Sequence, residues 1–297
     1  MRVLVTGLSG FVGSWCAQQF NAIDLADECG LVDLRDEARV RHAVAAIAPE
    51  AVLHLAGQSS VALSLISPSE TYDINCGGTH HLLRALGAAG FRGRMLYVGS
   101  ADVYGAVAAE QLPITEDCPV RPLNPYAASK VAAEALCAQW SQRDFEIVVA
   151  RPFNHIGPRQ STQFAVADFA RQIVACRAGR SPARLVVGNI DITRDFTDVR
   201  DIVRAYAALL QSGRNGEAYN VCSGVERSMS DIIDALCSLC GVKMDIEIDA
   251  ERLRPTEQLR MRGTFAKLAA DTGWAPQIAF EQTLRDIVDY WDKKDRT

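Results

Sequence analysis

Short apolar runs alternate with longer amphipathic stretches through the first half of the chain. The runs RVLVTG, AVLHLAG, MLYVGS and EIVVARPF have the length of buried strands. Amphipathic helices are expected from the first run through Phe20, over residues 72–86 and over residues 126–140. Buried strands that alternate with helices form parallel sheets with helices on both faces. The pattern therefore predicts an α/β fold built on a doubly wound parallel sheet.

The pattern changes after residue 153, where loops rich in Arg, Gly and Pro become longer. The elements expected there are a helix over residues 164–177, the strand ARLVVG and two later helices around Ile232 and Leu284. No clean linker separates the two parts. We expect a first domain over residues 1–152, to which residues 195–221 return, and a smaller α/β carboxy-terminal lobe over residues 153–297.

Composition narrows the partners and the compartment. With 48% hydrophobic and 23% charged residues, the chain of 297 residues is typical of a soluble globular enzyme. A net charge of -5 without a dense Lys/Arg block argues against nucleic acid or an anionic membrane as a partner, and no apolar run has transmembrane length. The first residues lack the features of a secretory signal, and nine scattered cysteines fit reduced thiols. We expect a cytoplasmic protein.

Three glycines follow the first predicted strand in the sequence TGLSGFVG. The missing side chains of Gly7, Gly10 and Gly13 allow a tight turn, close approach of a pyrophosphate and packing of the next helix on the strand. The positive end of that helix would face the phosphates. An ordinary strand-to-helix turn is the alternative, but the position directly after MRVLV favours a Rossmann-type dinucleotide site.

The acidic residue that binds the adenosine ribose in such sites is harder to locate. Asp33 has the expected spacing of about twenty residues, but GLVDLRD has the character of a loop after a later strand. Asp24 and Asp27 are competing candidates. Residues 21–31 are few for a second strand and its connection, which predicts a contracted unit. The sequence therefore leaves the choice between NADPH and NADH open.

A tyrosine and a lysine one helical turn apart carry the candidate chemistry. Tyr126 and Lys130 in NPYAASK share one helix face, and Pro125 suits a first helical turn. A free tyrosine has a pKa near ~10, and an adjacent ammonium favours the phenolate, so Tyr126 becomes a usable acid or base. Ser100, which ends MLYVGS, would donate a hydrogen bond to the same substrate oxygen. A surface helix that carries Tyr and Lys by chance is the alternative.

The sequence indicates no metal site. Cys237 and Cys240 lack a second pair and end an amphipathic helix, which favours core packing over zinc or redox chemistry. His54 lies inside an apolar strand, where a buried, hydrogen-bonded imidazole is expected. His155, beside Asn154, is a weaker candidate for a substrate contact. The histidines expected to pack or to face solvent are His80 and His81.

The motifs occur in the order found in a known family. They run over essentially the full length as TGLSGFVG, HLAGQSSV, VGSADVYG, NPYAASK, RPFNHIGP, RDFTDVRD, YNVCSG and RPTE. The chain thereby resembles the extended short-chain dehydrogenase/reductases that act on nucleotide sugars. Within that family, RPFNHIGPRQ and GNIDITRDFTDVRD look most like the GDP-4-keto-6-deoxy-D-mannose reductases, which form GDP-D-rhamnose.

This resemblance implies Ser100, Tyr126 and Lys130 as the catalytic set, with Asn75 supporting the lysine through its backbone or a water. Tyr126 would protonate the alkoxide that forms at the sugar C4, and Lys130 would hold the nicotinamide ribose. The other residues expected at the NADPH or NADH cofactor are Gly7, Gly10, Phe11, Val12, Gly13, Asp33, Leu34, Leu55, Ala56, Gly57 and Pro152.

The resemblance also implies a nucleotide-sugar substrate that is GDP-linked. Arg194 in TRDF and Arg254 in RPTE would meet the diphosphate and nucleotide, because guanidinium groups suit bidentate contacts to phosphate oxygens. Glu257 would address the nucleotide ribose, and Arg159 is a weaker candidate nearby. The remaining residues expected at the substrate are Ser100, Ala101, Asp102, Tyr126 and Asn154.

Asp102 bears on the type of reaction. The related 4,6-dehydratases need a glutamate two residues after the catalytic hydroxyl to abstract a proton, and the shorter Asp102 carboxylate reaches less far. The sequence therefore favours NAD(P)H-dependent reduction of the C4 ketone. A dehydratase or 4-epimerase with tightly bound NAD is the first alternative. A non-catalytic dinucleotide-binding protein is the second, which the presence of Ser100, Tyr126 and Lys130 disfavours.

The helices expected over residues 72–86 and 126–140 carry more Ala and Leu than one buried stripe needs. In the resembling family, these two helices pair across a two-fold axis as a four-helix bundle, which implies a homodimer. Tight packing inside one subunit is the alternative, because an alanine-rich face suits both arrangements.

Overall fold

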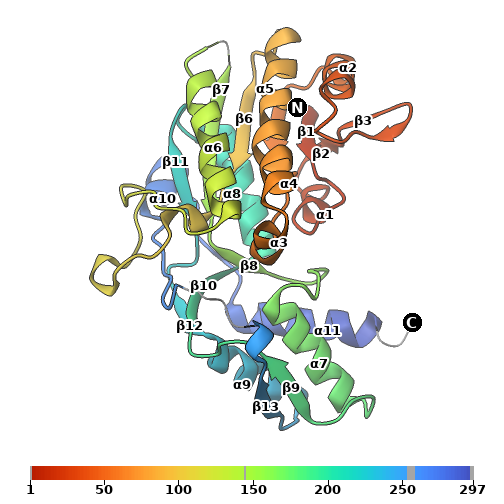
Figure 1. Ribbon diagram of the computed structural model, residues 1–297, viewed down its shortest axis with the longest axis vertical. Helices are drawn as coiled ribbons and strands as arrows, with labels where there is room; N and C mark the ends of the chain where they lie inside the picture. Colours follow the sequence, from red (N-terminus) through yellow and green to blue (C-terminus); the bar gives the residue numbers. More distant parts are fainter. Residues whose placement is uncertain (1, 144, 253–257, 295–297) are drawn as a thin grey trace.

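Six parallel strands form the central sheet of the computed structural model, which describes residues 2–143, 145–252 and 258–294 (Figure 1). Their order across the sheet is β11-β7-β6-β5-β1-β2. The strands are β1 (Arg2–Thr6), β2 (Asn21–Ile23), β5 (Ala51–His54), β6 (Arg94–Val98), β7 (Glu146–Pro152) and β11 (Ala218–Val221). The chain winds outward in both directions from β1, so the predicted doubly wound parallel sheet is confirmed.

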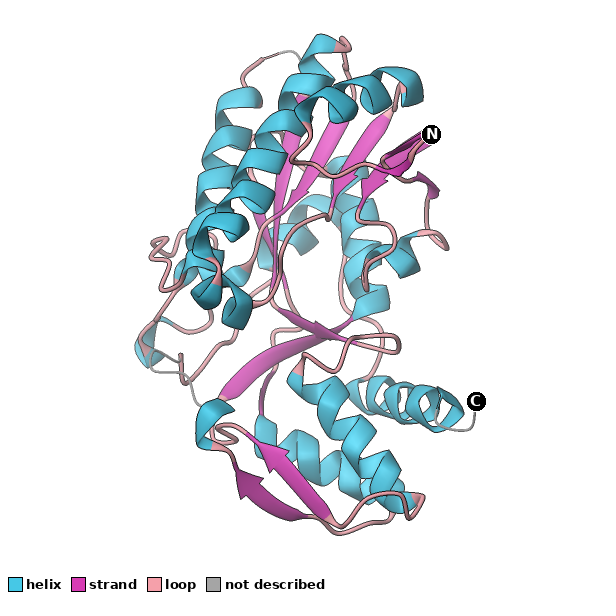
Figure 2. Ribbon diagram, turned by 45° about the vertical axis from the view of Figure 1, so that its right-hand side comes forward, coloured by secondary structure: helices cyan, strands magenta, loops and turns pink. Residues whose placement is uncertain are grey.

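Helices cover both faces of this sheet, as the continuous apolar strands require (Figure 2). One face packs against α2 (Glu37–Ile47), α5 (Gly78–Ala88) and α6 (Pro125–Trp140). The other face packs against α8 (Val199–Ser212) and α10 (Ala266–Thr272). The four residues of β5 are completely buried between these layers, which explains why AVLH carries no alternation of polar and apolar positions.

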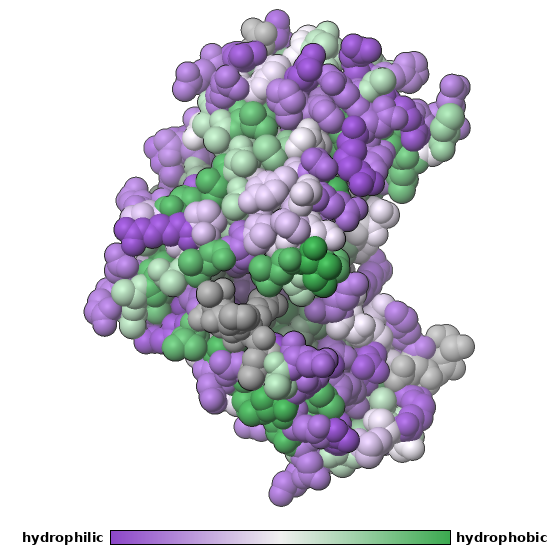
Figure 3. All heavy atoms as spheres, in the orientation of Figure 1, coloured by the Kyte–Doolittle hydropathy of each residue, from purple (hydrophilic) through white to green (hydrophobic). Residues whose placement is uncertain are grey.

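Two expected helices have different bounds. Helix α1 (Gly13–Cys16) ends four residues before Phe20, because the chain continues in tight turns before β2 begins at Asn21. The helix expected over residues 72–86 begins earlier, at α4 (Pro68–Tyr72), and passes through a π-helical turn (Asp73–Gly77) into α5. A short preceding helix, α3 (Val61–Ile66), exposes apolar side chains on the face shown in Figure 3.

The predicted contraction after β2 is confirmed. In place of a crossover helix, the chain forms an antiparallel hairpin of β3 (Ala26–Asp27) and β4 (Gly30–Leu31), and α2 follows. Asp24 lies directly after β2, whereas Asp33 lies in the loop between β4 and α2. This hairpin forms the outer rim of the sheet at the β2 edge (Figure 1).

Within the described ranges, the smaller half contains two short sheets and three α-helices (Figure 1). The first sheet consists of β8 (Asn154–Ile156), β10 (Thr193–Asp198) and β12 (Glu226–Ser228). The second consists of β9 (Arg184–Val187) and β13 (Asp245–Ile248). The helices are α7 (Ala165–Arg177), α9 (Met229–Cys240) and α11 (Phe280–Lys294), and they enclose a separate apolar core. Of the segment 195–221, β10 pairs with β8, while α8 and β11 lie in the larger half.

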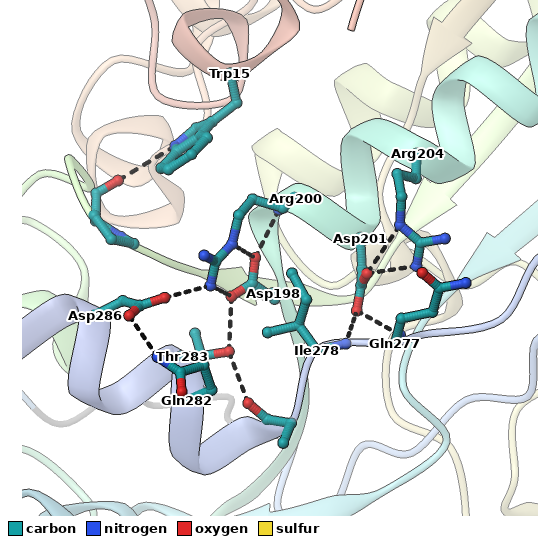
Figure 4. Close-up of polar contacts among 12 residues, drawn as sticks. Trp15, Asp198, Arg200, Asp201, Arg204, Gln277, Ile278, Gln282, Thr283 and Asp286 are labelled. Atoms are coloured by element: carbon teal, nitrogen blue, oxygen red, sulfur yellow. Dashed lines mark hydrogen bonds and ion pairs between the residues drawn. The ribbon is translucent and has the colours of Figure 1, made fainter. Parts of the chain in front are cut away.

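Carboxylates at the start of α8 tie the last part of the chain to the rest (Figure 4). The Asp201 carboxylate accepts backbone hydrogen bonds from Gln277 and Ile278, both at 2.9 Å. The Asp198 carboxylate accepts from Thr283 at 2.7 Å and pairs with Arg200. Because both carboxylates are fully buried, they need these donors. Helix α11 is thereby anchored to the strand-to-helix turn that precedes α8.

Among the described residues, no helix combines the length and apolar character needed to cross a membrane.

Candidate active site

The amino-terminal end of α6 holds the tyrosine and lysine of the sequence motif. Asn124 is the N-cap, and its side chain accepts a hydrogen bond from the backbone N–H of Ala127 at 2.8 Å. Pro125 occupies the first turn, as expected. Tyr126 and Lys130 follow with exposures of only 8% and 6%. They share one helix face, with the Lys130 Nζ 6.0 Å from the centre of the Tyr126 ring.

Ser100 reaches the phenol from the loop after β6. It starts a short 3₁₀ helix (Ala101–Tyr104), and its hydroxyl oxygen accepts a hydrogen bond from the backbone N–H of Asp102 at 3.2 Å. Its side chain lies close enough to Tyr126 for its hydrogen bonding to lower the pKa of the phenol. The sheet and α6 therefore bring together Ser100, Tyr126 and Lys130, the three residues that the sequence predicted as one group.

Burial controls the protonation of Tyr126. Removal from water raises the pKa of Tyr126 above its ordinary value, the nearby charge of Asp102 raises it further, and the hydrogen bond with Ser100 lowers it. The expected lowering of this pKa by the lysine ammonium is not seen in the structure. Lys130 instead donates a hydrogen bond to the Val98 carbonyl oxygen at 2.9 Å. Tyr126 is therefore protonated at neutral pH, as a proton donor must be.

Lys130 lies between aromatic rings and the end of β6. Burial lowers the pKa of Lys130 to about 8, while the charge of Glu134 one helical turn later opposes this shift. The Nζ lies 5.3 Å from the centre of the Tyr97 ring, where a cation is attracted by the π-electrons. Lys130 is therefore a cation whose proton is held less tightly than that of a surface lysine.

Asn75 lies in the π-helical turn and clamps two segments. Its amide group donates to the Gln58 carbonyl oxygen at 3.0 Å and to the Ser129 hydroxyl at 2.9 Å, and its carbonyl oxygen accepts from the Gln58 N–H at 2.8 Å. A Cβ at Gly57 would lie 2.9 Å from the Asn75 Oδ1 and 3.5 Å from the Lys130 Nζ. Asn75 is thus placed beside Lys130, with the loop after β5 against both.

The glycine turn after β1 is as tight as the motif predicts. The backbone N–H of Gly10 donates to the Gly7 carbonyl oxygen at 3.0 Å. A Cβ at Gly13 would lie 2.2 Å from that same carbonyl oxygen, so only glycine fits there. Phe11 and Val12 complete the turn, and the Phe11 ring stacks on His155 of β8 at 6.1 Å between ring centres.

A groove follows the carboxyl ends of β1, β2 and β5, where the winding direction of the sheet reverses. Such crevices are the usual ligand sites of doubly wound sheets. The residues that line it are Thr6, Gly7, Ser9, Asp24, Leu25, Leu31, Val32, Asp33, Leu34, Arg35, Ala56, Gly57, Gln58 and Ile74. The bare turn at one end and the carboxylates at the other suit the pyrophosphate and ribose of a dinucleotide, so the residues present fit such a cofactor.

Asp24 and Asp33 both line the far end of the groove. Both therefore remain candidates for the acidic residue that binds the adenosine ribose. Arg35 also lines the groove and pairs with the Asp33 carboxylate at 2.6 Å, which lowers the pKa of Asp33. Asp27 lies outside the lining. Its carboxylate pairs with Arg39 at 2.7 Å, and this hydrogen bond lowers the pKa of Asp27 to about 2.

The residues predicted to bind the cofactor fall into two groups, those that line the groove and those that do not. Five of the expected residues line the groove: Gly7, Asp33, Leu34, Ala56 and Gly57. The others surround it in the glycine turn, at the ends of β5 and β7 or around Tyr126; they are Gly10, Phe11, Val12, Gly13, Leu55, Asn75, Tyr126, Lys130 and Pro152. Pro152 is buried at the end of β7.

The predicted substrate residues lie on both halves of the molecule. Ala101 and Asp102 follow Ser100, while Asn154 begins β8 with an exposed side chain. Arg194 lies in β10, opposite Arg227 of β12. Arg254 and Glu257 lie outside the described residues. Arg159 stacks its guanidinium over the Trp15 ring at 5.0 Å, which gives it a packing role.

The histidines and cysteines mostly have the structural places expected for them. His54 is 1% exposed and hydrogen-bonded at both ring nitrogens. His155 is half-buried and stacks on Phe11, and desolvation lowers its pKa. Cys237 and Cys240 pack at the end of α9 with free thiols. In the described ranges, no three His, Cys, Asp or Glu side chains form a group that could hold a metal ion.

Sequence reasoning missed Arg35, Gln58 and Arg262. Arg35 follows Asp33 in DLRD, and a cation beside the expected ribose acid was an available signal. Gln58 offered no such signal, because its place depends on Asn75 from a distant helix. The Arg262 Nε is buried without a hydrogen-bond partner, close enough to Glu226 to lower the pKa of that carboxyl.

A dinucleotide groove beside a buried serine, tyrosine and lysine defines the class of short-chain dehydrogenase/reductases. The family model for GDP-mannose 4,6 dehydratase matches residues 27–287. The chain belongs to this family of extended short-chain dehydrogenase/reductases, which confirms the resemblance seen in its motifs. It is 44% identical to the GDP-6-deoxy-D-mannose reductase of Pseudomonas aeruginosa, across 99% of this chain and 98% of that protein.

Solved structures agree with this assignment. The structure of RMD from Pseudomonas aeruginosa complexed with NADPH superposes with a TM-score of 0.93 and 43% identity, covering 99% of each chain. The Thermus thermophilus UDP-glucose 4-epimerase complex with NAD superposes with a TM-score of 0.86 and 29% identity, covering 98% of this chain and 99% of that one. The Rossmann-type fold is therefore confirmed.

Proposed function

We propose that the protein is an NADPH-dependent oxidoreductase that reduces the C4 ketone of GDP-4-keto-6-deoxy-D-mannose to give GDP-D-rhamnose. The observation that carries this proposal is a protonated, buried Tyr126 between Ser100 and Lys130, beside a groove fit for a dinucleotide. The 44% identity to a GDP-6-deoxy-D-mannose reductase supports the substrate, and the NADPH in the similar solved structure supports the cofactor.

Proton transfer is the step that the side chains can perform. The bound nicotinamide cofactor supplies the hydride. Tyr126, which keeps its proton because it is buried, donates that proton to the oxygen of the former ketone. Ser100 bonds to the phenol and orients the same oxygen. Lys130 provides a positive charge 6.0 Å from the centre of the Tyr126 ring and would hold the nicotinamide ribose.

The side chain of Asp102 favours reduction over dehydration. Asp102 takes the place where the related dehydratases need a glutamate, and its charge raises the pKa of Tyr126. A raised pKa helps the phenol to remain an acid and hinders its action as a base. The second candidate is a 4,6-dehydratase or 4-epimerase with bound NAD, which is favoured by the 30% identity to the UDP-glucose 4-epimerase of Mycolicibacterium smegmatis, across 99% of both chains.

Arg35 supports NADPH as the preferred cofactor. The guanidinium lies in the lining of the groove beside Asp33, 48% exposed, where it can pair with a 2′-phosphate. Replacement of Arg35 by Ala is expected to raise the KM for NADPH at least about tenfold and to change the KM for NADH much less. The control is Arg285→Ala on the exposed face of α11. Equal changes with both cofactors would contradict this role.

We assign the nucleotide end of the substrate to the part of the smaller half around β8, β10 and β12. Arg194 lies in β10 opposite Arg227 of β12, and Arg260 lies two residues before Arg262, whose Nε is buried. These guanidinium groups supply positive charge for a diphosphate. Asn154 adds an exposed amide, and the proposed contacts of Arg254 and Glu257 complete this end.

A cytoplasmic homodimer is proposed as the working form. Large apolar side chains are exposed on α3 and at the end of α4, and they are Leu63, Leu65, Ile66 and Tyr72. Contact with a second copy along α4, α5 and α6 would remove such side chains from water. We also propose a division between residues 1–152, with return of α8 and β11, and residues 153–297, because separate apolar cores support it.

The deciding experiment incubates the purified protein with GDP-4-keto-6-deoxy-D-mannose and either NADPH or NADH. Loss of absorbance by the reduced cofactor is followed, and the sugar product is identified by nuclear magnetic resonance. GDP-D-rhamnose formed in proportion to oxidised NADPH is the expected result. Turnover of GDP-mannose without net consumption of cofactor would support the dehydratase instead.

A further inference from the structure

A buried hydrogen-bond chain runs from the glycine turn to the helix that contains Asn75. Thr6 ends β1, His54 ends the neighbouring strand β5, and Thr79 lies in α5. All three residues are 1% exposed. The His54 Nδ1 lies 2.7 Å from the Thr6 hydroxyl, and its Nε2 lies 2.9 Å from the Thr79 hydroxyl. The imidazole therefore bridges two strands and a helix.

The contacts of the two hydroxyls determine the direction of each hydrogen bond. Thr79 donates its proton to the Asn75 backbone carbonyl oxygen at 2.6 Å, since a carbonyl oxygen only accepts. Its oxygen must then accept from an N–H at the His54 Nε2. In a neutral ring with its proton on Nε2, the Nδ1 is an acceptor, so the Thr6 hydroxyl donates to it while the Thr6 oxygen accepts from the backbone N–H of Ala56 at 3.2 Å. Only the neutral imidazole with its proton on Nε2 satisfies every group.

The surroundings of His54 agree with a neutral ring. Burial lowers the pKa of His54 to about 3, and the charge of Lys130 lowers it further. An imidazolium would have to donate at both nitrogens. The Thr6 hydroxyl would then lose its acceptor at the Nδ1, whereas Thr79 would keep its donation to the Asn75 carbonyl oxygen.

The chain ends at Asn75, which is bonded to both sides of the Lys130 site. Its side chain holds the backbone of Gln58 in the groove and the hydroxyl of Ser129 in α6. Ser129 directly precedes Lys130 and donates to the Tyr126 carbonyl oxygen at 2.7 Å. A shift of the Asn75 backbone would therefore move both the groove wall and the helix that carries the proton donor.

We propose that His54 is a positioning residue: as the Nε2–H tautomer it joins Thr6 to Thr79 and thereby fixes Asn75 relative to Lys130. The inference rests on the proposed reduction, because turnover is the property that this geometry serves. His54 acts through Asn75 and through Ser129 and does not touch the substrate.

The test compares Thr79→Val, which keeps the shape and removes the hydroxyl, with Thr79→Ser, which keeps the hydroxyl. Thr79→Val is expected to lower kcat about tenfold with less than about a threefold change in the dissociation constant of NADPH, while Thr79→Ser restores most of kcat. The matched control is Thr272→Val in α10, where the hydroxyl bonds to its own helix at 2.7 Å. This control is expected to keep the wild-type kcat.

Two outcomes separate the possible failures. If the wild-type protein does not oxidise NADPH with the ketosugar, the proposed function fails. The tautomer of His54 is then tested by nitrogen-15 resonance alone. If the wild type is active and Thr79→Val has the wild-type kcat, or loses only thermal stability, the positioning role is overturned. Nitrogen-15 resonance of the labelled histidines gives a readout without turnover. His54 is expected to be neutral with its proton on Nε2 from pH 6 to 9, and a proton on Nδ1 or a titration in that range overturns the proposal.

Discussion

Tyr126 and Lys130 are neighbours on α6, and burial moves both side chains toward their uncharged forms. The pKa of Tyr126 rises and the pKa of Lys130 falls to about 8, because the charged state of each loses hydration. A short motif reveals such a pair, but the size and sign of its pKa shifts depend on the layers that cover it.

Replacement of Tyr126 by Phe removes the proposed proton donor while keeping the ring. We expect kcat to fall by about 100-fold or more, with NADPH affinity nearly unchanged, because the phenol acts on the reacting oxygen. Steady-state rates and fluorescence titration with NADPH measure the two properties. Tyr290→Phe in α11 is the control. Turnover at the wild-type rate in Tyr126→Phe would exclude this residue as the donor.

Replacement of Lys130 by Met is expected to abolish turnover and to stabilise the fold. At pH 7 the Lys130 ammonium is charged in both the folded and the unfolded chain. The full cost of burying this charge therefore lowers the free energy of unfolding of the wild type. The shift from 10.5 to about 8 corresponds to about 3 kcal/mol, and loss of the bond to Val98 leaves a gain of about 1–3 kcal/mol.

The gain in the free energy of unfolding from Lys130→Met is expected to decrease as the pH rises. Between pH 8 and 10.5 the unfolded chain binds more protons at this lysine, so the wild type becomes more stable as pH rises. The advantage of Lys130→Met should therefore shrink over that window. Denaturant unfolding at pH 7 and pH 10 measures the difference, and an unchanged or growing advantage would contradict the assigned burial cost.

At the scale of elements, apolar runs predicted the strands at the centre of the sheet, because these strands are buried along most of their length. The four strand runs became β1, β5, β6 and β7, and Pro125 begins α6 as expected. The π-helical turn at residues 73–77 and the early end of α1 were not predicted. Both depend on contacts with distant segments, such as the bonds from Asn75 to Gln58 and Ser129, which a local pattern does not contain.

An ion pair between Glu134 and Arg151 joins α6 to β7. The two side chains are each 11% exposed and lie 2.7 Å apart, and Arg151 also donates to the Tyr104 hydroxyl at 3.0 Å. Arg151→Ala is expected to lower the free energy of unfolding by about 3–5 kcal/mol, because the Glu134 carboxylate stays buried without its partner. Adding Glu134→Leu should recover part of this loss. Chemical denaturation measures both, and a double variant less stable than Arg151→Ala would contradict this explanation.

At the scale of the whole molecule, the segment from Gln277 into α11 is held by the carboxylates of Asp198 and Asp201 at the start of α8 (Figure 4). Asp201→Ala leaves the backbone N–H groups of Gln277 and Ile278 without their acceptor. We expect a loss of about 2–4 kcal/mol in the free energy of unfolding. The exposed Asp289 provides the control, for which Asp289→Ala should change it by less than about 0.5 kcal/mol. Equal stability of the two variants would contradict the anchoring role.

In the candidate site, short motifs reveal some residues, whereas others are placed by contacts between segments far apart in the sequence. Ser100, Tyr126 and Lys130 are marked by short motifs, and the structure brings them together. The chain through His54 depends on which distant segments meet at the sheet edge, so no spacing rule reveals it, whereas the only sequence signal for Arg35 is its position two residues after Asp33.

The β3–β4 hairpin separates cofactor choice from fold stability. Its residues Cys29, Gly30 and Leu31 are exposed, and it leads into the Asp33 and Arg35 side chains of the groove. Mutations in this exposed rim can therefore accumulate during evolution, or be introduced in the laboratory, without disturbing the core of the sheet. With Arg35 as the proposed contact to the 2′-phosphate, this rim is where a lineage would exchange one redox cofactor pool for another while the helix that carries Tyr126 remains unchanged.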